Sequence, residues 1–275
     1  MNTLLGNRSF NSAFKSFVRT RKLACKISKL GAGRMSEEDR VFWASVLFTR
    51  MCVIALSLER LNTHNIPEKF IPDNWDYAST FSLTRNLMEC FHTLFYLCFD
   101  DISDEERSMR KQVFNLHDIF SREDMFSFIG QDSSNNFEVK QEMIEQIRNK
   151  LTMNSHFQSF PENLKKECLK GKKALLLSRE QIEEKSGRDK QLFKFLYKWF
   201  SSNTHTYPLG FYRMIDFDRG IGVKTEVEEL YAASAIDVAE NYLVAAIQRM
   251  FEIYSDIPDK LSPQELQLVG CTAKK

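Results

Sequence analysis

Four polar side chains recur along one predicted helix at a spacing that places them on one face. Arg85, Glu89, His92 and Tyr96 follow one another at i, i+4, i+7 and i+11. At about 100° per residue, these positions form one narrow stripe. An arginine can bind an anion, and a histidine exchanges protons near neutral pH. The spacing therefore predicts a polar cleft suited to acid–base chemistry on an anionic substrate.

The same stripe also has a structural interpretation. The segment 75–99 contains no lysine and is apolar over most of its circumference, so this helix should be largely buried. Charges in such a place must be paired, because isolated charges in a low dielectric are very costly. Arg85 and Glu89 would then form an ion pair that only organises the helices around them.

Arg85, Asn86 and His92 also match a short family motif. The order Arg85-Asn86-x5-His92 resembles the R-x4–6-H motif of the HEPN (higher eukaryotes and prokaryotes nucleotide-binding) superfamily. The resemblance implies a helical bundle that cleaves RNA without a metal, usually as a dimer whose two motifs build one cleft. It implies that Arg85 stabilises charge on the scissile phosphate, that His92 is a general acid or base, and that the RNA 2′-OH attacks. Arg110 and His117, on the next predicted helix, repeat the spacing and form a second candidate pair.

A wider resemblance covers residues 36–255. The order of a first helix, Arg85-x3-Glu89, Tyr197-x3-Ser201-x3-His205 and a long closing helix is similar to an uncharacterised group of bacterial all-helical proteins. Some of that group are associated with phage defence. The resemblance implies that Arg85, Glu89, Ser201 and His205 belong together. The structural alternative for His205 is a histidine that binds free carbonyls at a helix C-terminus.

Other chemistries find less support in the residues. Glu89-x-x-His92 has the spacing of a di-metal ligand pair, but none of the other histidines has a glutamate three residues before it. No glycine-rich phosphate-binding loop follows a predicted strand. We therefore expect neither a metal nor a cofactor.

Residues 1–34 hold eight lysines or arginines and no acidic residue. Phe10, Phe14 and Phe17 would form one apolar stripe if this segment were helical. A basic amphipathic arm suits contact with nucleic-acid or membrane phosphates, or a targeting function, and the alternative is a first helix packed on an acidic body. The candidate nucleic-acid-binding residues are Arg19, Arg21, Lys22, Lys26, Lys29 and Arg34.

Composition favours helices over strands. Only 10 glycines and 6 prolines occur in 275 residues, whereas sandwiches and barrels need many turn-forming residues. No uncharged run approaches the roughly 18 residues of a membrane-spanning helix, so no transmembrane segment is expected. The six cysteines form no C-x-x-C pair and no secretory leader is evident, which is typical of reduced thiols in the cytoplasm.

Capping sequences mark the starts of the predicted helices. The pattern S/T-x-x-E/Q begins at Ser103, Ser178, Thr225 and Ser262, and Ser36 begins a variant that ends in aspartate. Apolar spacing predicts long helices over 37–62, 75–99, 104–120, 137–152, 192–203 and 226–255. A loop is expected over 130–136, and prolines and glycines predict an irregular segment over 206–224 that could hold a short hairpin.

Together these patterns predict an all-α protein, a bundle of long helices with a variable helical insert. We expect a basic N-terminal arm (1–35), a helical-bundle domain (36–258) and a polar C-terminal tail (259–275). The expected function is a HEPN-like, metal-independent ribonuclease or toxin effector in bacterial antiphage defence, working as a homodimer or within a larger complex. The alternative is a non-catalytic helical module that binds RNA, another nucleic acid or a protein partner.

Overall fold

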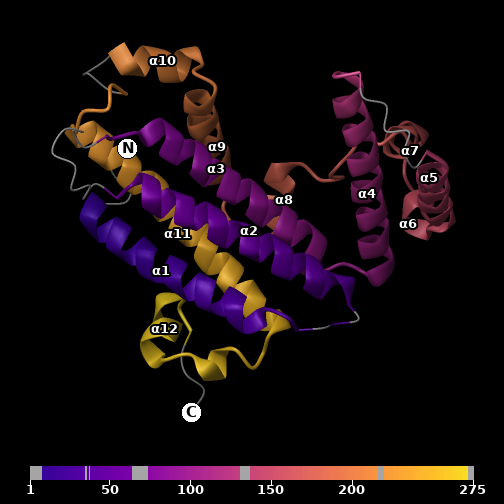
Figure 1. Cartoon of the computed structure of the whole chain (residues 1–275), viewed down its shortest axis with the longest axis horizontal. Helices are drawn as coiled ribbons and strands as arrows, with labels where there is room; N and C mark the ends of the chain where they lie inside the picture. The colour runs from indigo at the N-terminus through magenta and orange to yellow at the C-terminus, as the bar shows by residue number, and fades with distance from the viewer. Residues whose placement is uncertain are drawn as a thin grey trace. The chain divides into compact units, whose positions relative to one another are not determined.

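The computed structural model describes residues 8–34, 36, 38–63, 74–130, 137–215 and 220–271. Within these ranges the chain forms helices and no β-strand, which confirms the all-α prediction (Figure 1). The chain divides into two compact units. Unit 1 comprises residues 1–99 and 183–275, and unit 2 is the segment 100–182 inserted between them.

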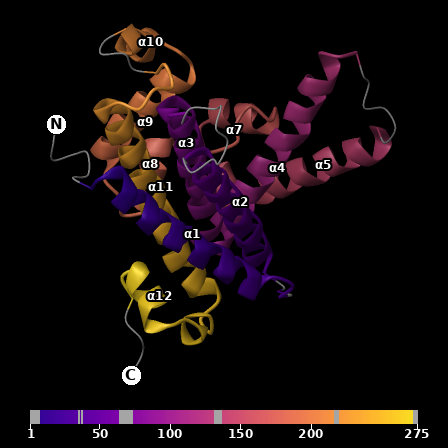
Figure 2. The same ribbon diagram turned by 60° about the vertical axis from the view of Figure 1, so that its left-hand side comes forward.

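Long helices pack side by side to form unit 1 (Figures 1 and 2). They are α1 (Phe10–Gly31), α2 (Asp39–Leu61), α3 (Tyr77–Leu94), α9 (Lys190–Thr204) and α11 (Glu226–Ile253). The shorter α8 (Arg179–Lys185) reaches unit 1 at Glu183, and a π-helical turn, Phe95–Phe99, extends α3. The predicted helices 37–62, 75–99, 192–203 and 226–255 are thus confirmed to within a few residues.

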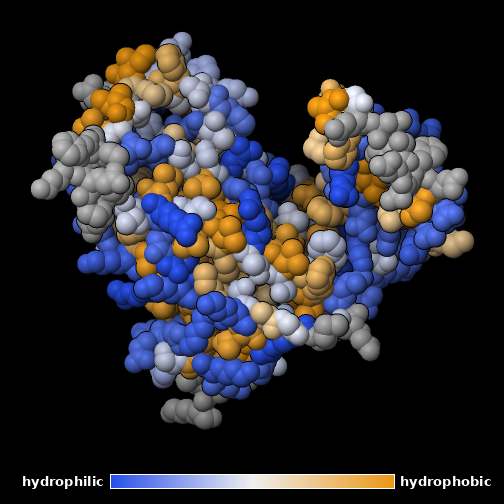
Figure 3. All heavy atoms as spheres, in the orientation of Figure 1, coloured by the Kyte–Doolittle hydropathy of each residue, from blue (hydrophilic) through white to orange (hydrophobic). Residues whose placement is uncertain are grey.

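Two of these helices, α2 and α11, are long and apolar enough to cross a membrane by length and composition. This is weak evidence, because the core helix of a folded soluble protein meets the same criterion. The apolar window of α11 is 72% buried inside the protein, and that of α2 is 39% buried. On α2, Phe42, Val46 and Val53 are exposed, and Figure 3 shows apolar surface over this part of unit 1. The absence of a membrane-spanning segment stays a prediction.

Unit 2 has a hydrophobic core of its own. It contains α4 (Asp104–Ser127), α5 (Phe137–Met153), α6 (Ser155–Gln158) and α7 (Glu162–Leu169). The buried side chains include Met109, Val113, Leu116, Ile144, Leu151 and Phe157. Gly171 follows α7 with φ +67°, and a side chain at this position would collide with the ring of Phe120. The predicted helices 104–120 and 137–152 lie here, and most of the predicted loop 130–136 falls outside the described residues.

Most of the predicted capping residues occupy the expected positions. Ser103, Thr225 and Ser262 each accept a hydrogen bond from the backbone amide three residues later. Ser178 accepts from the amide of Gln181, whose side chain accepts from the Ser178 amide in return. The Ser36 prediction is wrong. Helix α2 begins at Asp39 after Glu38, and Ser36 only accepts a hydrogen bond from the Glu38 amide.

The described residues of the segment 206–224 form no hairpin, so that prediction is wrong for them. Residues Pro208–Ile215 form helix α10, because a proline's fixed φ angle suits the first turn of a helix. The extended backbone near the end of this segment instead forms one isolated antiparallel bridge, between Gly222 and Trp75.

The predicted arm and tail are not separate parts in the structure. Phe10 and Phe17 of α1 are buried, and α1 packs against α2 and α11, as the alternative of a first helix on an acidic body proposed. Arg8 binds Asp237 and Glu240 of α11. The predicted tail forms α12 (Pro263–Leu268), which packs on α1 through buried Leu266, because its apolar residues are spaced along a capped helix.

Candidate functional site

Arg85 lies at the centre of a hydrogen-bonded cluster in unit 1. Its Nε donates to Glu89 Oε1 at 3.0 Å, and its Nη2 donates to the Tyr197 hydroxyl at 2.9 Å. Its Nη1 lies 3.2 Å from Nε2 of His205. The Tyr197 hydroxyl in turn donates to Glu89 Oε1 at 2.8 Å. We call these four residues the Arg85 cluster.

Two packed helices bring the cluster together. Arg85 and Glu89 lie one turn apart on α3, while Tyr197 lies on α9 and His205 caps its C-terminus. The helices are held by a contact of Phe81 with Trp199, whose ring centroids are 4.7 Å apart. The predicted grouping of Arg85 and Glu89 with His205 is therefore present in the structure.

The cluster is open to solvent on one side. The side chains of Arg85 and Glu89 are 20% and 28% exposed, and His205 is exposed. Burial works against the charged guanidinium, but Tyr197 and Glu89 outweigh it and raise the pKa of Arg85, so this group stays cationic. An anion can therefore reach a fixed positive charge that has an imidazole and a carboxylate beside it.

Ser201 was predicted to belong with Arg85, Glu89 and His205, but its side chain makes no hydrogen bond to them. Its Oγ is buried and has no hydrogen-bond partner within the described ranges, and its backbone carbonyl accepts from the His205 amide at 3.1 Å. A Ser201–His205 nucleophile pair is thus not formed. The residue after His205, Thr206, has φ +52°, a strained conformation for a β-branched side chain.

His92 does not share this site with Arg85. Its side chain is 1% exposed, and its Nε2 lies 2.7 Å from Oε2 of Glu183. Glu183 also accepts hydrogen bonds from the Tyr242 hydroxyl at 2.8 Å and from Arg188 Nε at 3.0 Å. Burial raises the pKa of Glu183, but His92, Arg188 and Tyr242 together outweigh burial and hold that pKa below its usual value.

The expected single stripe along α3 therefore divides in two. The angular spacing was right, but α8 and α11 bring Glu183 and Tyr242 against His92, which is buried, and Tyr96 one turn further on is buried as well. The spacing of residues determines their angle around the helix axis, but it does not show which neighbouring helices pack against each turn. As a correction, Arg85 and His92 do not open to one cleft. Glu89 and His92 likewise bind different partners, so they do not act as a ligand pair.

The second candidate pair, Arg110 and His117, has structural contacts within unit 2. Arg110 is buried and donates to Asp100 Oδ2 at 2.7 Å and to Glu106 Oε1 at 2.6 Å. His117 Nδ1 lies 2.7 Å from the carbonyl oxygen of Gly171. The two side chains serve different contacts and form no common site.

The basic residues of α1 fall into two groups. Three of the six candidates form ion pairs within unit 1: Arg21 with Glu59, Lys26 with Glu265, and Arg34 with Asp256. The others, Arg19, Lys22 and Lys29, are exposed, and no ion pair involves them within the described part of the chain. They continue, with Lys15 and Lys26, as an exposed row along one face of α1, which we call the α1 basic row.

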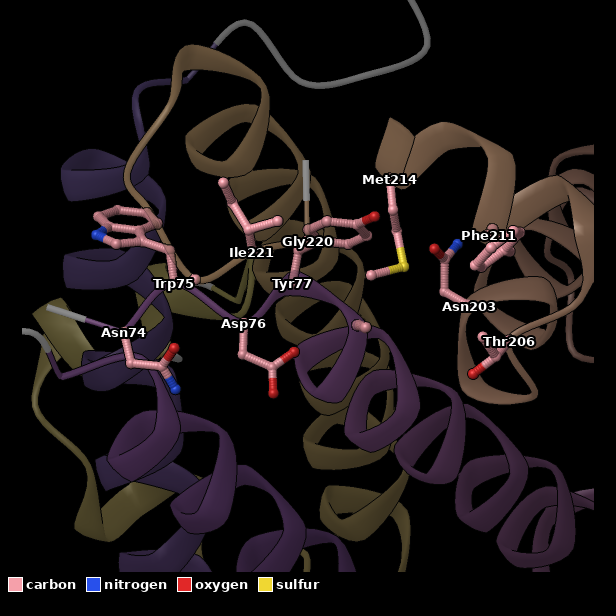
Figure 4. A pocket seen from close by; sticks show the side chains of 13 residues that line it. Asn74, Trp75, Asp76, Tyr77, Asn203, Thr206, Phe211, Met214, Gly220 and Ile221 are labelled. Atoms are coloured by element: carbon pink, nitrogen blue, oxygen red, sulfur yellow. The ribbon is translucent and has the colours of Figure 1, made fainter. Parts of the chain in front are cut away.

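A cavity of about 420 Å³ between the start of α3, the end of α9 and α10 gave no sequence signal, because its walls come from separate segments. In Figure 4, Asp76 at the start of α3 lies across from Asn203 of α9 and Met214 of α10. Phe211 and Thr206 also line it, and Asn203 and Thr206 flank His205 in the chain. The wall thus combines a carboxylate, an amide and an aromatic ring.

The fold and the site define an all-α protein with a half-exposed Arg–Glu–Tyr–His cluster. A model of a family of unknown function, DUF5677, matches residues 41–222, which is more than half of the chain. The chain belongs to this family. The matched range includes all four residues of the Arg85 cluster. No curated protein and no solved structure matches the chain.

Proposed function

We propose that this protein is a metal-independent ribonuclease of the toxin type and that the Arg85 cluster is its active site. The observation that carries the proposal is that one guanidinium holds a carboxylate, a phenol and an exposed imidazole within hydrogen-bonding distance. The role in bacterial antiphage defence rests on the resemblance to the group of helical proteins described above. All four groups come from one chain, so the chemistry itself needs no second protomer.

The cluster supplies each group that RNA transesterification requires. The Glu89 carboxylate removes the proton of the RNA 2′-OH, and the resulting 2′-oxygen attacks the adjacent phosphorus. Arg85 stabilises the negative charge that develops on the phosphoryl oxygens. His205, as the imidazolium, gives its proton to the departing 5′-oxygen. The products are a 2′,3′-cyclic phosphate and a 5′-hydroxyl end.

Substrate binding prepares His205 for this role. A guanidinium can only donate, so in the present arrangement His205 Nε2 accepts from Arg85. A phosphate bound at Arg85 would take over that hydrogen bond and leave His205 Nε2 free to contact the substrate. Tyr197 holds the side chains of Arg85 and Glu89 in place through its hydroxyl, so it is a positioning residue.

The neighbouring cavity supports a nucleic-acid substrate. Asp76 and Asn203 offer hydrogen-bonding groups for the edge of a base, and Phe211 offers a ring on which a base can stack. The strained backbone at Thr206 lies between the cavity residues and His205, and such strain is concentrated at functional sites.

Cleavage of short RNAs by the purified full chain, with EDTA present, tests the proposal. We expect fragments that end in 2′,3′-cyclic phosphate, detected by mass spectrometry. The matched control is the same oligonucleotide with one 2′-deoxy sugar at the cleaved position, which should stay intact because the nucleophile is missing. Cleavage of the deoxy substrate would contradict the mechanism, and intact RNA at every pH between 5 and 8 would contradict the proposed activity.

The α1 basic row favours a second, non-catalytic candidate function, the binding of nucleic-acid phosphates. Its five exposed basic residues recur at i, i+4, i+7, i+11 and i+14: Lys15, Arg19, Lys22, Lys26 and Lys29, of which Lys26 is paired with Glu265. A continuous positive row along a helix follows a phosphate backbone without reading its sequence. A module of this kind would bind RNA and leave it intact.

Salt dependence measures the contribution of the row. Replacing Arg19, Lys22 and Lys29 together with alanine should reduce the slope of log affinity for single-stranded RNA against log salt by about 2, at roughly 0.7 per phosphate contact. Fluorescence anisotropy at several salt concentrations provides the measurement. The control replaces three lysines of unit 2, Lys166, Lys170 and Lys172. Equal slopes in both variants would show that the α1 basic row does not contact the RNA.

A further inference from the structure

Helices α1 and α2 meet along a seam of paired side chains. Ser28 Oγ lies 2.9 Å from Thr49 Oγ1 at one point of the seam, and Arg21 binds Glu59 at another. The α2 partner has a higher residue number where the α1 residue has a lower one, so the two helices are antiparallel. One turn back from Ser28 is Cys25, and one turn on from Thr49 is Cys52. The seam thus sets these cysteines opposite each other, close enough for the side chain of Cys52 to act on the pKa of Cys25.

The two thiols have different surroundings. Cys25 is half-buried and lines a groove of about 480 Å³ together with Arg21, Lys22, Lys26 and Lys29. Cys52 is buried. A small polar oxidant can therefore reach Cys25 from solvent, whereas Cys52 is shielded from it.

The pKa values of the two thiols are shifted in opposite directions. The hydrogen bond from Cys52 lowers the pKa of Cys25 to about 6; burial opposes this effect, and Arg21 and Lys29 reinforce it. The hydrogen bond with Cys25 and burial raise the pKa of Cys52. The lowered pKa of Cys25 favours its thiolate, which is the nucleophilic form, and the raised pKa of Cys52 favours its thiol.

We propose that Cys25 and Cys52 form a peroxide-reactive pair that closes a disulfide between α1 and α2. The Cys25 thiolate attacks hydrogen peroxide and breaks the O–O bond, which gives a sulfenic acid and hydroxide. The Cys52 sulfur then attacks the Cys25 sulfur, so the S–O bond breaks and its oxygen leaves as water with the Cys52 proton. Peroxide is reduced by two electrons, and the two thiols are oxidised to the disulfide.

None of the other cysteines combines a lowered pKa, access from solvent and a facing cysteine within the described part of the chain. Burial raises the pKa of Cys90 and that of Cys168 to about 11, which disfavours their thiolates. Cys98 is buried. Cys271 is half-exposed at the other end of the chain and serves as the internal reference for a surface thiol without the groove.

Mass spectrometry of the reduced full chain treated with hydrogen peroxide tests the proposal. We expect a product about 2 Da lighter, for the two hydrogens lost, and a tryptic peptide pair that joins Cys25 to Cys52. Cys52→Ser should stop at a Cys25 sulfenic acid that dimedone traps, and Cys25→Ser should prevent both products. Cys271→Ser is the matched control and should behave as wild type.

A second measurement uses the wild-type protein and tests for the Cys25 thiolate through its rate of alkylation. At pH 6, Cys25 should react with iodoacetamide about tenfold faster than an ordinary cysteine, after allowing for the lower nucleophilicity of an acidic thiolate. The proposal is overturned if wild type stops at the sulfenic acid, if no peptide joins the two residues, or if Cys25 reacts no faster than Cys271.

Discussion

Replacing His205 with glutamine should lower the rate of RNA cleavage by about 10²–10⁴, the usual loss when a general acid is removed. Glutamine keeps a polar side chain at the exposed end of α9, so the fold should be unchanged. The measurement is the initial rate of cleavage in EDTA, alongside a thermal melt of each variant. The control, His156→Gln, changes a histidine of unit 2 that contacts Ser103 and should retain full activity.

Arg85 and His92 variants separate this site from the HEPN motif interpretation. Arg85→Ala should cost about 10²–10³ in rate, as the loss of one charge-stabilising donor does elsewhere. A His92 variant that still folds should keep its activity, because His92 is enclosed with Glu183. If His205→Gln is fully active while a folded His92→Gln is inactive, the Arg85 cluster is not the active site.

Replacing Glu183 with alanine should destabilise the protein by about 3–5 kcal/mol, because removal of one partner leaves other buried polar groups unpaired. The side chains of Glu183 and His92 are 3% and 1% exposed, and Tyr242 loses its acceptor in the same step. Urea unfolding followed by circular dichroism measures the change. The adjacent control, Glu184→Ala, loses only a solvent-exposed pair with Lys190 and should cost less than about 1 kcal/mol.

The pH dependence of stability tests whether the charge of Glu183 causes the stabilisation. The pKa of Glu183 is lower in the folded protein than its usual value near 4.5. Its carboxylate therefore adds stability above that value, and this contribution is lost as the pH falls through the folded pKa. The stability difference between wild type and Glu183→Gln should shrink below about pH 4.5. A difference that stays constant down to pH 3 would contradict this account.

The elements of the fold follow largely from local sequence signals. Ser103, Ser178, Thr225 and Ser262 marked helix starts correctly, because a cap depends on a hydrogen bond between residues three apart. Apolar spacing gave the long helices for the same reason. A variable helical insert was predicted, but its bounds, 100–182, were not. The register between helices is not local, so the packing of the predicted basic arm into unit 1 could not be derived in this way.

The candidate site shows the same division between local and non-local information. Spacing on α3 paired Arg85 with Glu89, and spacing on α9 aligned Tyr197 with His205, but only the packing of α3 on α9 joins the two pairs. The burial of His92 depends on Glu183, about ninety residues away. The contact between Cys25 and Cys52 likewise depends on the antiparallel register of two helices and leaves no motif in either one.

Unit 1 is built from two stretches of chain that are synthesised far apart in time. Helix α1 packs against α11, and the whole of unit 2 is translated between them. At roughly 5–20 residues per second, the ribosome takes about 10–45 s to proceed from the end of α1 to the end of α11. Unit 2 has a local core and can fold in that interval, whereas the part of the apolar face of α1 that packs on α11 stays uncovered on the nascent chain. A chaperone that shields this face during translation would therefore raise the yield of folded protein, and ribosomes that stall before α11 would release chains prone to aggregation.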